Sequence, residues 1–598
     1  MAKNTRGLPP DPSDLYLRWG ITHGFGNLFQ QQGSVGLLIQ WKSPADAKAA
    51  VKFIPADAQV PQIYLQPRGK PLRVPPFWAL TVSIKSLPGF LSSIQHLAIA
   101  IDLAAPVAPN PFAVAQNLSP VHSKHHTLTA VLDDGCAFAN ERFRRANGTR
   151  VMWLWNQNAS APGAPVSFGY GAQWSKADLD SFFPALGGTQ DEAYSDAGLA
   201  GLRRSAVHGT HVMDLLAGKD AGESHMSDIV FVQFPQEGID DPSGRWLSHF
   251  AFDGLLYVVA CAGLATKRIV VNISWGPQTG PHDGTYVMEA LIEWLVLEQK
   301  SIGRELIVTL AAGNSFSAKA HACVNYAAGG SFDWILPPDG EIQAFVEFWW
   351  PQSVLPANAR LRVIAPGDAP VDLVVGSQSA VDLSWQAELG QVGASTRAIL
   401  TVNPTGGTGV VKGRDGRWQF VILPTAGGIA EDIDVYVARA DHNMGARRRA
   451  KASHLTDAGL EKQRFVAASD RDLEAPGSAI RRAGTLSGIA TGRSSHVAAG
   501  YVLKPDAPAP YSSSGPTRGL RKVPDYAMMT DRSEARAGVR SAGVRTGTKV
   551  RLVGTSTAAP QLGRRLAEKI LPKPPLPADP PRSGKGRVIP LISLIGPE

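Results

Sequence analysis

The stretch GTSTAAP at residues 554–560 carries the strongest local signal in this chain. It places Ser556 where a loop of small residues enters a helix, whose first turn can hold Pro560. The backbone N–H groups of such a first turn lack acceptors within the helix and can stabilise a negative charge. A serine hydroxyl beside these donors can attack a carbonyl group, but only if a base takes its proton. We therefore expect the rest of the chain to supply a base and a group that orients it.

Three upstream stretches supply these groups, in the chain order VLDDG at 131–135, HGTH at 208–211 and AAGN at 311–314. An apolar run ends at two carboxylates, Asp133 and Asp134, either of which can orient the imidazole of His208, so that His208 can act as a base toward Ser556. Asn314 closes another apolar run after a glycine, where its amide can donate a hydrogen bond to a developing oxyanion. Together, the four stretches predict a site for serine acyl transfer.

At these four stretches the chain resembles the subtilisin-like serine peptidases, which carry their triad in the order Asp, His, Ser on an α/β fold. The order is the same here. NISWGP at 272–277 is similar to the family's substrate-binding strand, and YSSSGPT at 511–517 is similar to its Ser-Ser-x-Gly-Pro segment. The resemblance covers two parts of the chain, residues 126–321 and 470–572.

The resemblance implies a serine endopeptidase that hydrolyses peptide bonds through an acyl-enzyme intermediate. Asp133, His208 and Ser556 would form the triad, and Asn314 would be the oxyanion donor. The substrate-binding strand would contribute Ser274, Trp275 and Gly276. Two other interpretations remain: a pseudoprotease scaffold whose cleft is never opened, and an esterase or peptide ligase on the same fold.

Some neighbours of these residues have competing interpretations. His211 follows His208 by three positions, but no Glu stands in the metalloprotease spacing HExxH, so a structural role is expected. Asp134 makes an Asp-Asp-Gly segment that resembles the kexin-like branch, whose members prefer basic residues before the cut. Asp283 is a candidate acidic wall for such a residue, and a solvated loop aspartate is the alternative.

The sequence predicts no metal ligands and no required cofactor. Calcium sites are common in the family, but the chain has no EF-hand-type run of Asp and Asn, so calcium is left open without assigned ligands. The expected partner is a protein or peptide substrate.

Composition limits the classes of protein to consider. The 598 residues suggest two to four units, and a hydrophobic content of 44% makes the chain globular. The net charge is +8, but charged residues are only 18% and no motif of aromatic and basic residues appears, so no nucleic-acid partner is expected. The three cysteines, Cys136, Cys261 and Cys323, are too few for a disulfide framework and are expected to be buried thiols.

Targeting signals are not apparent. The first residues carry charge and proline where a signal peptide would need an apolar run, and the longest apolar stretch, 254–266, is too short to cross a bilayer. We expect a soluble protein without a membrane partner, cytoplasmic by default, with secretion by another route left open.

The expected fold is α/β. A doubly wound parallel sheet like that of subtilisin would hold an inserted antiparallel β-sandwich or jelly roll and follow a small α+β pro-domain-like region. The insert is expected where helical periodicity disappears and short alternating runs begin. The pro-domain-like region is expected where a strand, a helix and a strand precede the catalytic part, and an ordinary N-terminal packing layer is the alternative.

These patterns set the expected units. They are 1–75 with no assigned role, 76–125 pro-domain-like, 126–332 the first catalytic part, 333–441 the β-sandwich, 442–572 a linker and the second catalytic part, and 573–598 a C-terminal tail. The sandwich is expected to recognise a protein partner or substrate. The basic segment 445–454 is interpreted as a solvated linker rather than a nucleic-acid patch.

Overall fold

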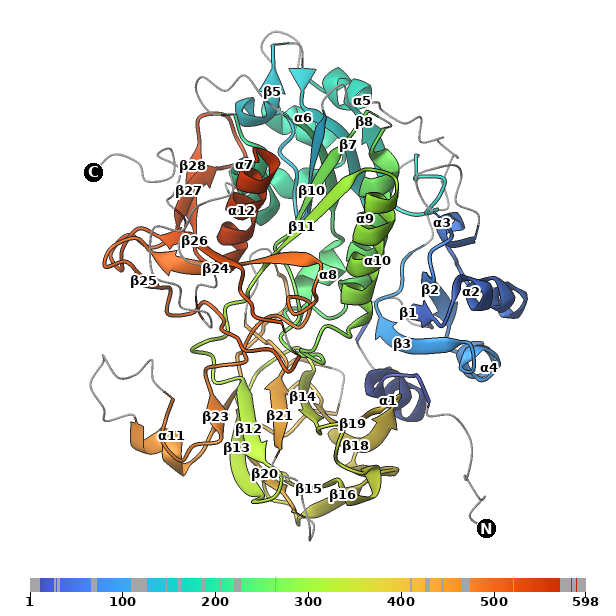
Figure 1. Ribbon diagram of the computed structural model, residues 1–598, viewed down its shortest axis with the longest axis vertical. Helices are drawn as coiled ribbons and strands as arrows, with labels where there is room; N and C mark the ends of the chain where they lie inside the picture. Colours follow the sequence, from blue (N-terminus) through green and yellow to red (C-terminus); the bar gives the residue numbers. More distant parts are fainter. Residues whose placement is uncertain are drawn as a thin grey trace.

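A nine-stranded sheet, with helices beside it, occupies the upper half of the computed structural model in the view of Figure 1. The structure describes residues 11–25, 28–29, 33–65, 73–108, 126–146, 148–159, 163–183, 189–203, 206–219, 227–263, 265–408, 411–424, 431–441, 446–463, 474–519 and 521–569, together with 582 and 588.

Most neighbouring strands of this sheet are parallel. In spatial order they are β7 (Val151–Asn156), β9 (Asp228–Gln233), β4 (Thr127–Asp133), β10 (Arg268–Ile273), β11 (Glu305–Ala311), β24 (Ser495–Val502) and β26 (Tyr526–Asp531). The short strands β8 (Ala172–Ser175) and β25 (Ala507–Pro508) pair antiparallel with β7 and β24. The first of the parallel strands in the chain, β4, lies between β9 and β10, so the direction of winding reverses at β4. Sheets of this kind bind ligands at such a reversal, outside the carboxyl ends of the strands.

Helices cover both faces of the sheet. On one face, α9 (Ser248–Cys261) packs on β4 and β9, and α10 (Val287–Ser301) packs on β11 and β24. On the other face, α7 (His208–Ala217) and α12 (Ala558–Ala567) pack on the sheet and on each other (Figure 1). Because both faces are covered, the strands are largely buried apolar runs, as in β10, where the residues from Ile269 to Ile273 are buried and all but Asn272 are apolar. The predicted α/β class with a parallel sheet is therefore confirmed.

The N-terminal part forms a separate three-stranded antiparallel sheet. Its order is β2 (Phe77–Ser83), β1 (Ser34–Trp41) and β3 (Ala98–Ala104), with α2 (Pro44–Ala50) and α4 (Leu87–Ile94) beside it. β1 and β2 pack against α9, and β1 also contacts α10. The central strand, β1, lies upstream of the expected boundary at residue 76, so that boundary divides a single sheet. We call residues 33–108 the N-terminal unit.

Two antiparallel sheets occupy the chain between β11 and β24. The larger has seven strands in the order β17, β18, β19, β14, β21, β12, β23, and the smaller has five in the order β16, β15, β20, β13, β22. Their bounds are β12 (His321–Asn325), β13 (Gly330–Leu336), β14 (Ala344–Trp349), β15 (Arg360–Ile364), β16 (Val371–Val374), β17 (Ser377–Asp382), β18 (Trp385–Val392), β19 (Ser395–Val402), β20 (Gly416–Ile422), β21 (Asp432–Val437), β22 (His454–Thr456) and β23 (Ile480–Arg481).

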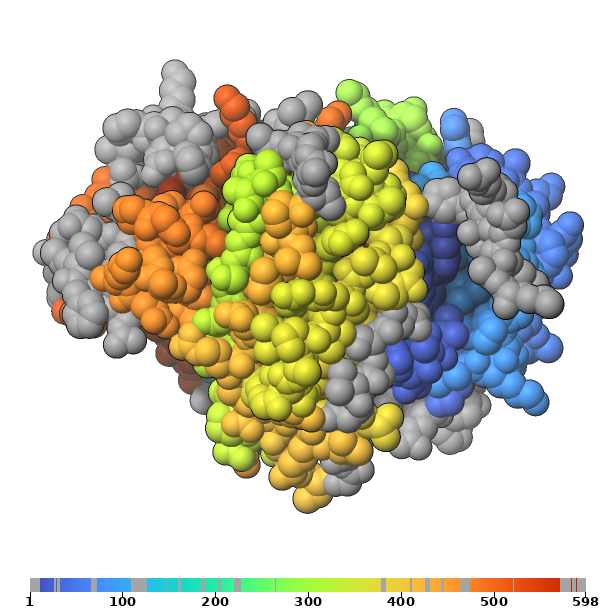
Figure 2. All heavy atoms as spheres, turned by 90° about the horizontal axis from the view of Figure 1, so that it is seen from below, coloured from blue at the N-terminus to red at the C-terminus, as the bar shows by residue number. Residues whose placement is uncertain are grey.

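The two sheets share one hydrophobic core, which includes Trp334, Trp385 and Trp418. Strand pairing begins at β12 and ends at β23, so it extends beyond the expected limits of 333–441 on both sides. The short strands β12, β22 and β23 have no alternation long enough to be recognised in the sequence. Figure 2 shows these strands between the N-terminal unit (blue) and the part of the chain near residue 500 (orange).

Arg245, which lies just before α9, connects the segment at residues 14–16 with the antiparallel sheets. It is buried and forms ion pairs of 2.7 Å with Asp14, the N-cap of α1 (Leu15–His23), and of 3.4 Å with Glu347 of β14. The ring of Tyr16 lies under its guanidinium, and the Tyr16 hydroxyl donates to Glu347 at 2.7 Å. A buried charge with several partners is costly to expose, so the parts are expected to behave as one body.

Within the described residues, none of the helices combines the length and the apolar composition of a membrane span. The three cysteines are free thiols; Cys136 and Cys261 are buried and Cys323 is half-buried.

Candidate active site

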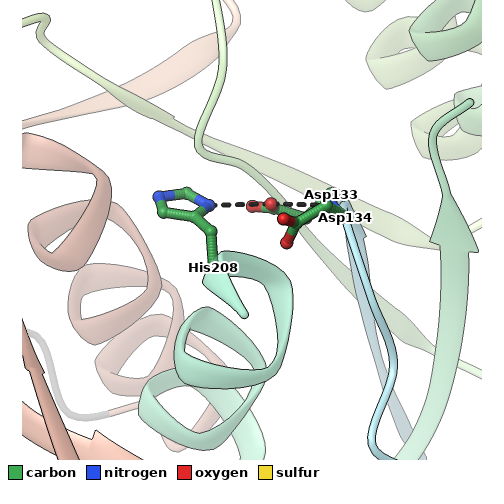
Figure 3. Close-up of side chains that lie close together, drawn as sticks. All are labelled: Asp133, Asp134 and His208. Atoms are coloured by element: carbon green, nitrogen blue, oxygen red, sulfur yellow. Dashed lines mark hydrogen bonds and ion pairs between the residues drawn. The ribbon is translucent and has the colours of Figure 1, made fainter. Parts of the chain in front are cut away.

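Asp133 and His208 meet at the carboxyl end of β4. Asp133 is the last residue of that strand, and His208 is the first residue of α7, which packs on it. The Nδ1 atom of His208 lies 2.7 Å from Oδ1 of Asp133 (Figure 3). Since a carboxylate can only accept, Nδ1 carries the proton, and in the neutral ring Nε2 is the atom that can take a proton from a nucleophile.

The environment of His208 makes it a strong base. Burial disfavours the charged ring and lowers its pKa, but the charge of Asp133 and their hydrogen bond, together with the charge of Asp134, raise the pKa to about 9. The charge of Arg439, which lies just after β21, opposes this rise. The imidazole is therefore charged at neutral pH and becomes available as a base in the alkaline range.

Asp134 holds the start of α7. Its Oδ1 accepts a hydrogen bond of 2.6 Å from the backbone N–H of Gly209, at the positive end of the helix dipole. Asp133, Asp134 and His208 each offer one possible metal-ligand atom, and these atoms lie within 4.8 Å of one another. They are the one such group of three or more acidic, histidine or cysteine residues in the described part of the chain. The Nδ1 of His208 and one oxygen of each carboxylate are engaged in the hydrogen bonds given above. We therefore interpret the group as an Asp–His pair with a helix cap.

Ser556 lies on the turn η6 (Thr555–Thr557), directly before α12. The turn contacts α7, whose first residue is His208, and the Ser556 residue is 9% exposed. In the described residues no hydrogen bond joins the Ser556 hydroxyl to His208. The structure thus joins Asp133 to His208 directly and places Ser556 on the neighbouring turn. Hydrogen bonds of this kind are often long without a substrate and tighten when one binds.

Asn314 is fixed by the residue before Ser556. Its Oδ1 accepts from the backbone N–H of Thr555 at 2.9 Å and from the Thr555 hydroxyl at 3.0 Å. A Cβ on Gly554 would lie 3.2 Å from Nδ2 of Asn314 and 3.3 Å from Oγ of Ser556, so the amide nitrogen and the hydroxyl face the same small space. Asn314 is exposed to solvent, which leaves its N–H₂ group accessible to a ligand.

Further residues that the sequence did not single out support this turn. Tyr511 accepts a hydrogen bond of 3.1 Å from the backbone N–H of Gly554 and donates one of 2.6 Å to Asp531. Burial and the charge of Asp531 raise the pKa of Tyr511, so its hydroxyl keeps its proton. Tyr511 begins the YSSSGPT segment, but its contact with a residue 43 positions away leaves no signal in a single sequence.

The predicted substrate-binding strand has a supporting role in this structure. Ser274 is 7% exposed, and its hydroxyl donates to the carbonyl of Ser556 at 2.8 Å. A Cβ on Gly276 would lie 2.2 Å from the hydroxyl of Ser487, so this backbone passes very close to its neighbour. Trp275 is half-buried between them in the sequence.

His211 and Asp283, two of the residues with competing interpretations, have hydrogen-bond partners outside this turn. His211 is fully buried, and its Nε2 donates to the carbonyl of Val539 at 3.0 Å. Burial lowers its pKa to about 4, so it remains neutral. Asp283 accepts from the backbone N–H of Thr285 at 3.0 Å, and it lines a cavity of about 220 Å³ with Arg245 and Trp349, where the N-terminal unit meets the antiparallel sheets.

Solved structures of similar shape are known. The CspB protease of Clostridium perfringens matches with a TM-score of 0.56 and 18% sequence identity, over 79% of this chain and 94% of that chain. The PatG macrocyclase in complex with peptide matches with a TM-score of 0.29 and 11% identity, over 78% of this chain and 89% of that chain, which is too distant to support an argument.

No protein-family model matches the sequence, and a search of the curated proteins finds no match. At 18% identity, the likeness to the CspB protease concerns the fold alone. The parallel sheet, its helices on both faces and this likeness together show that the chain has a subtilisin-like α/β fold.

Proposed function

We propose that the protein is a serine endopeptidase that uses Ser556 as its nucleophile. The observation that carries the proposal is the 2.7 Å hydrogen bond between His208 and Asp133, beside a turn on which Ser556 shares a small space with the amide of Asn314. The CspB protein, which has a similar fold, is a protease, and this agrees with the proposal.

In the proposed reaction, the Ser556 hydroxyl attacks the carbonyl carbon of a peptide bond while Nε2 of His208 takes its proton. Asp133 stabilises the imidazolium that forms. The carbonyl oxygen becomes an oxyanion that receives hydrogen bonds from Asn314 and from backbone N–H groups at the start of the helix. His208 then gives the proton to the leaving amine, which produces an acyl-enzyme, and water hydrolyses this ester by the same steps in reverse.

Labelling with a fluorophosphonate tests the nucleophile. We expect the probe to modify Ser556, as located by mass spectrometry, and we expect Ser556→Ala to lose both labelling and activity. The loss of activity should be about 10⁶ in kcat, the value measured for the triad serine of subtilisin. Ser301→Ala, at an exposed serine that ends α10, is the matched control. A protein that is folded but not labelled would support the pseudoprotease scaffold instead.

A digest of a peptide library separates the remaining alternatives. Cleavage of internal peptide bonds supports an endopeptidase, whereas labelling of Ser556 with turnover of esters alone supports an esterase. Joining of peptides in place of cleavage supports a ligase. We propose a protein or peptide as the substrate and no required cofactor.

The other parts of the chain have proposed roles as well. The N-terminal unit would act as a pro-domain-like inhibitor, and the contacts of β1 and β2 with α9 support this role. Self-cleavage between residues 105 and 126 would then release this unit; most of that stretch lies outside the described residues. The two antiparallel sheets would recognise a protein partner or substrate. A deletion that tests this role should remove 321–479 rather than 333–441, because the shorter cut separates β12, β13 and β22 from their partners.

A further inference from the structure

Three arginines lie on, or directly before, the two-stranded hairpin that leads into Ser556. The hairpin consists of β27 (Val539–Ala542) and β28 (Lys549–Leu552), and the register places Arg540 directly opposite Arg551. Arg536 lies in the loop before β27. Arg536 and Arg551 are exposed and Arg540 is half-buried. We call Arg536, Arg540 and Arg551 the hairpin arginines.

The positive charge of this surface is not neutralised. Like charges directly opposite each other on neighbouring strands destabilise a hairpin. Partial burial lowers the pKa of Arg551, and the charges of Arg540, Arg532 and Arg536 lower it further. Within the described chain, none of the hairpin arginines forms an ion pair, although Glu534 is exposed in the same loop. Such repulsion is relieved when an anionic partner binds.

The hairpin is held in a fixed position relative to Ser556. Arg551 donates to the carbonyl of Gly538 at 3.0 Å, and the N–H of Gly538 donates to Asp531 at 2.8 Å. Asp531 in turn accepts from Tyr511, which accepts from Gly554 at 3.1 Å. Arg551 is five positions from Ser556, so the two backbones are at most about 17 Å apart. The exposed side chain of Val553 lies between them in the chain.

The hairpin also packs on the helix that begins with the proposed base. β27 packs on α7, which begins at His208, and His211 of that helix donates to Val539 of β27. His208 must protonate the leaving amine, so the segment of a substrate that follows the scissile bond departs past α7. An extended segment advances about 3.3 Å per residue, so a substrate segment that followed α7 would cover the distance limit of about 17 Å between Ser556 and Arg551 within about five residues.

We propose that the hairpin arginines bind acidic side chains of the substrate, two to five positions after the scissile bond. This inference rests on the proposed peptidase function and adds a specificity to it. Arginine suits the role because its planar guanidinium pairs with carboxylates through two parallel hydrogen bonds. The apolar Val553 would face the intervening part of the substrate.

Two fluorogenic peptides test the proposal. They are identical up to the scissile bond and carry either four Glu or four Gln in the second to fifth positions after it. We expect the Glu peptide to have a kcat/KM about tenfold higher, because a few partly screened charge pairs contribute to its binding. The ratio of the two kcat/KM values should fall as salt is added.

The triple substitution R536Q/R540Q/R551Q should bring the two peptides to equal rates. Arg360→Gln, an exposed arginine on β15, is the matched control and should keep the preference.

A binding measurement separates this proposal from the proposed function. Fluorescence anisotropy of a labelled Glu-rich peptide on the Ser556→Ala protein reports binding without hydrolysis. If the wild-type protein cleaves neither peptide but this binding is lost in the triple variant, the surface proposal stands and the peptidase proposal fails. If peptides are cleaved with no preference for Glu, or if the preference survives in the triple variant, the surface proposal is wrong. A preference for Glu before the scissile bond also overturns it, as does tighter binding of an oligonucleotide to the same arginines.

Discussion

Asn314 and Thr555 are joined by two hydrogen bonds, of 2.9 and 3.0 Å, although 241 positions separate them in the chain. Both bonds end on the side-chain oxygen of Asn314. A backbone N–H must face an acceptor, so these bonds identify the oxygen and direct the amide nitrogen away from Thr555. The orientation of the proposed oxyanion donor is therefore set by the residue next to the proposed nucleophile.

Asn314→Asp is expected to lower kcat by roughly 10²–10³, the range for loss of one oxyanion donor in subtilisin, with little change in KM. The aspartate keeps the acceptor that Thr555 uses but replaces the donor with a negative oxygen. Thr555→Val removes only one of the two anchoring bonds and should cost less than about tenfold. Steady-state kinetics of both variants check this. An effect of Asn314→Asp on KM alone would assign Asn314 to ground-state binding.

The pH profile should reflect the pKa of His208, which is raised to about 9. Because the base must be neutral, kcat/KM should increase about tenfold per pH unit below 9 and then level off. Asp134→Asn should move this rise to lower pH, since it removes a charge that raises the pKa. Asp283→Asn, which is not among the groups that shift His208, should leave the profile in place. A profile that falls between pH 7 and 9 would point to a different base.

The raised pKa of His208 also affects the stability of the fold, which should fall as the pH rises, whereas kcat/KM should increase. The raised pKa of His208 means that the folded state binds a proton more tightly than the unfolded chain. This contribution to the free energy of unfolding is complete below pH 6.5 and is lost as the pH rises through about 9. Denaturant titrations at several pH values can measure the loss, and Asp133→Asn should reduce it.

Gly554→Ala should impair catalysis more than stability. Gly554 has φ of +125°, and the new methyl group would lie close to Asn314 and Ser556. We expect kcat to fall by at least about tenfold and the free energy of unfolding by about 1–3 kcal/mol. Gly303→Ala is the control, because Gly303 also has a positive φ but open space around it. Equal losses of activity in both variants would show that backbone strain, and not the contact with the site, is responsible.

Asp434→Ala should destabilise the junction between the antiparallel sheets and the parallel sheet. Asp434 pairs with Arg518 at 2.8 Å and with His321 at 2.9 Å, and the other ring nitrogen of His321 donates to a carbonyl at 2.7 Å. Removing the carboxylate leaves Arg518 and His321, both largely buried, without their acidic partner. This should lower the free energy of unfolding by about 3–5 kcal/mol. Asp372→Ala, which breaks an exposed pair with Arg362, should cost at most about 1 kcal/mol. Chemical denaturation of the two variants makes the comparison.

The sequence was most informative about those buried parallel strands that lead to a polar residue of the candidate site. The parallel strands are apolar runs covered on both faces, so β4, β10 and β11 and the helix α10 could be predicted from single segments. The strand β1 could not, because SVGLLIQW stands among Gln-rich and Gly-rich residues and acquires its pairing from β2 and β3. Strand β12 likewise becomes a strand only through its contacts with β21 and β23.

For the candidate site, the sequence predicted the residues that would perform the chemistry better than those that hold them. Asp133 and His208 follow recognisable local patterns, and the structure places them in contact. The bond from Ser274 to the Ser556 carbonyl and the Tyr511–Asp531 support could not be predicted, because each joins residues that are distant in the chain. The spacing of local motifs carries no information about such contacts.

The order of the strands has a consequence for biosynthesis. Strand β4 lies in the interior of the sheet and is made early, whereas β24, β26 and α12 are made last and join one side. A ribosome that has just added Asn314 must add 241 further residues before Thr555 exists to orient it. At typical rates of 5–20 residues per second, this takes roughly 10–50 s. During that interval the nascent chain already contains the N-terminal unit, Asp133 and His208 but not the proposed nucleophile, so the proposed reaction cannot begin until the last part of the chain has been made.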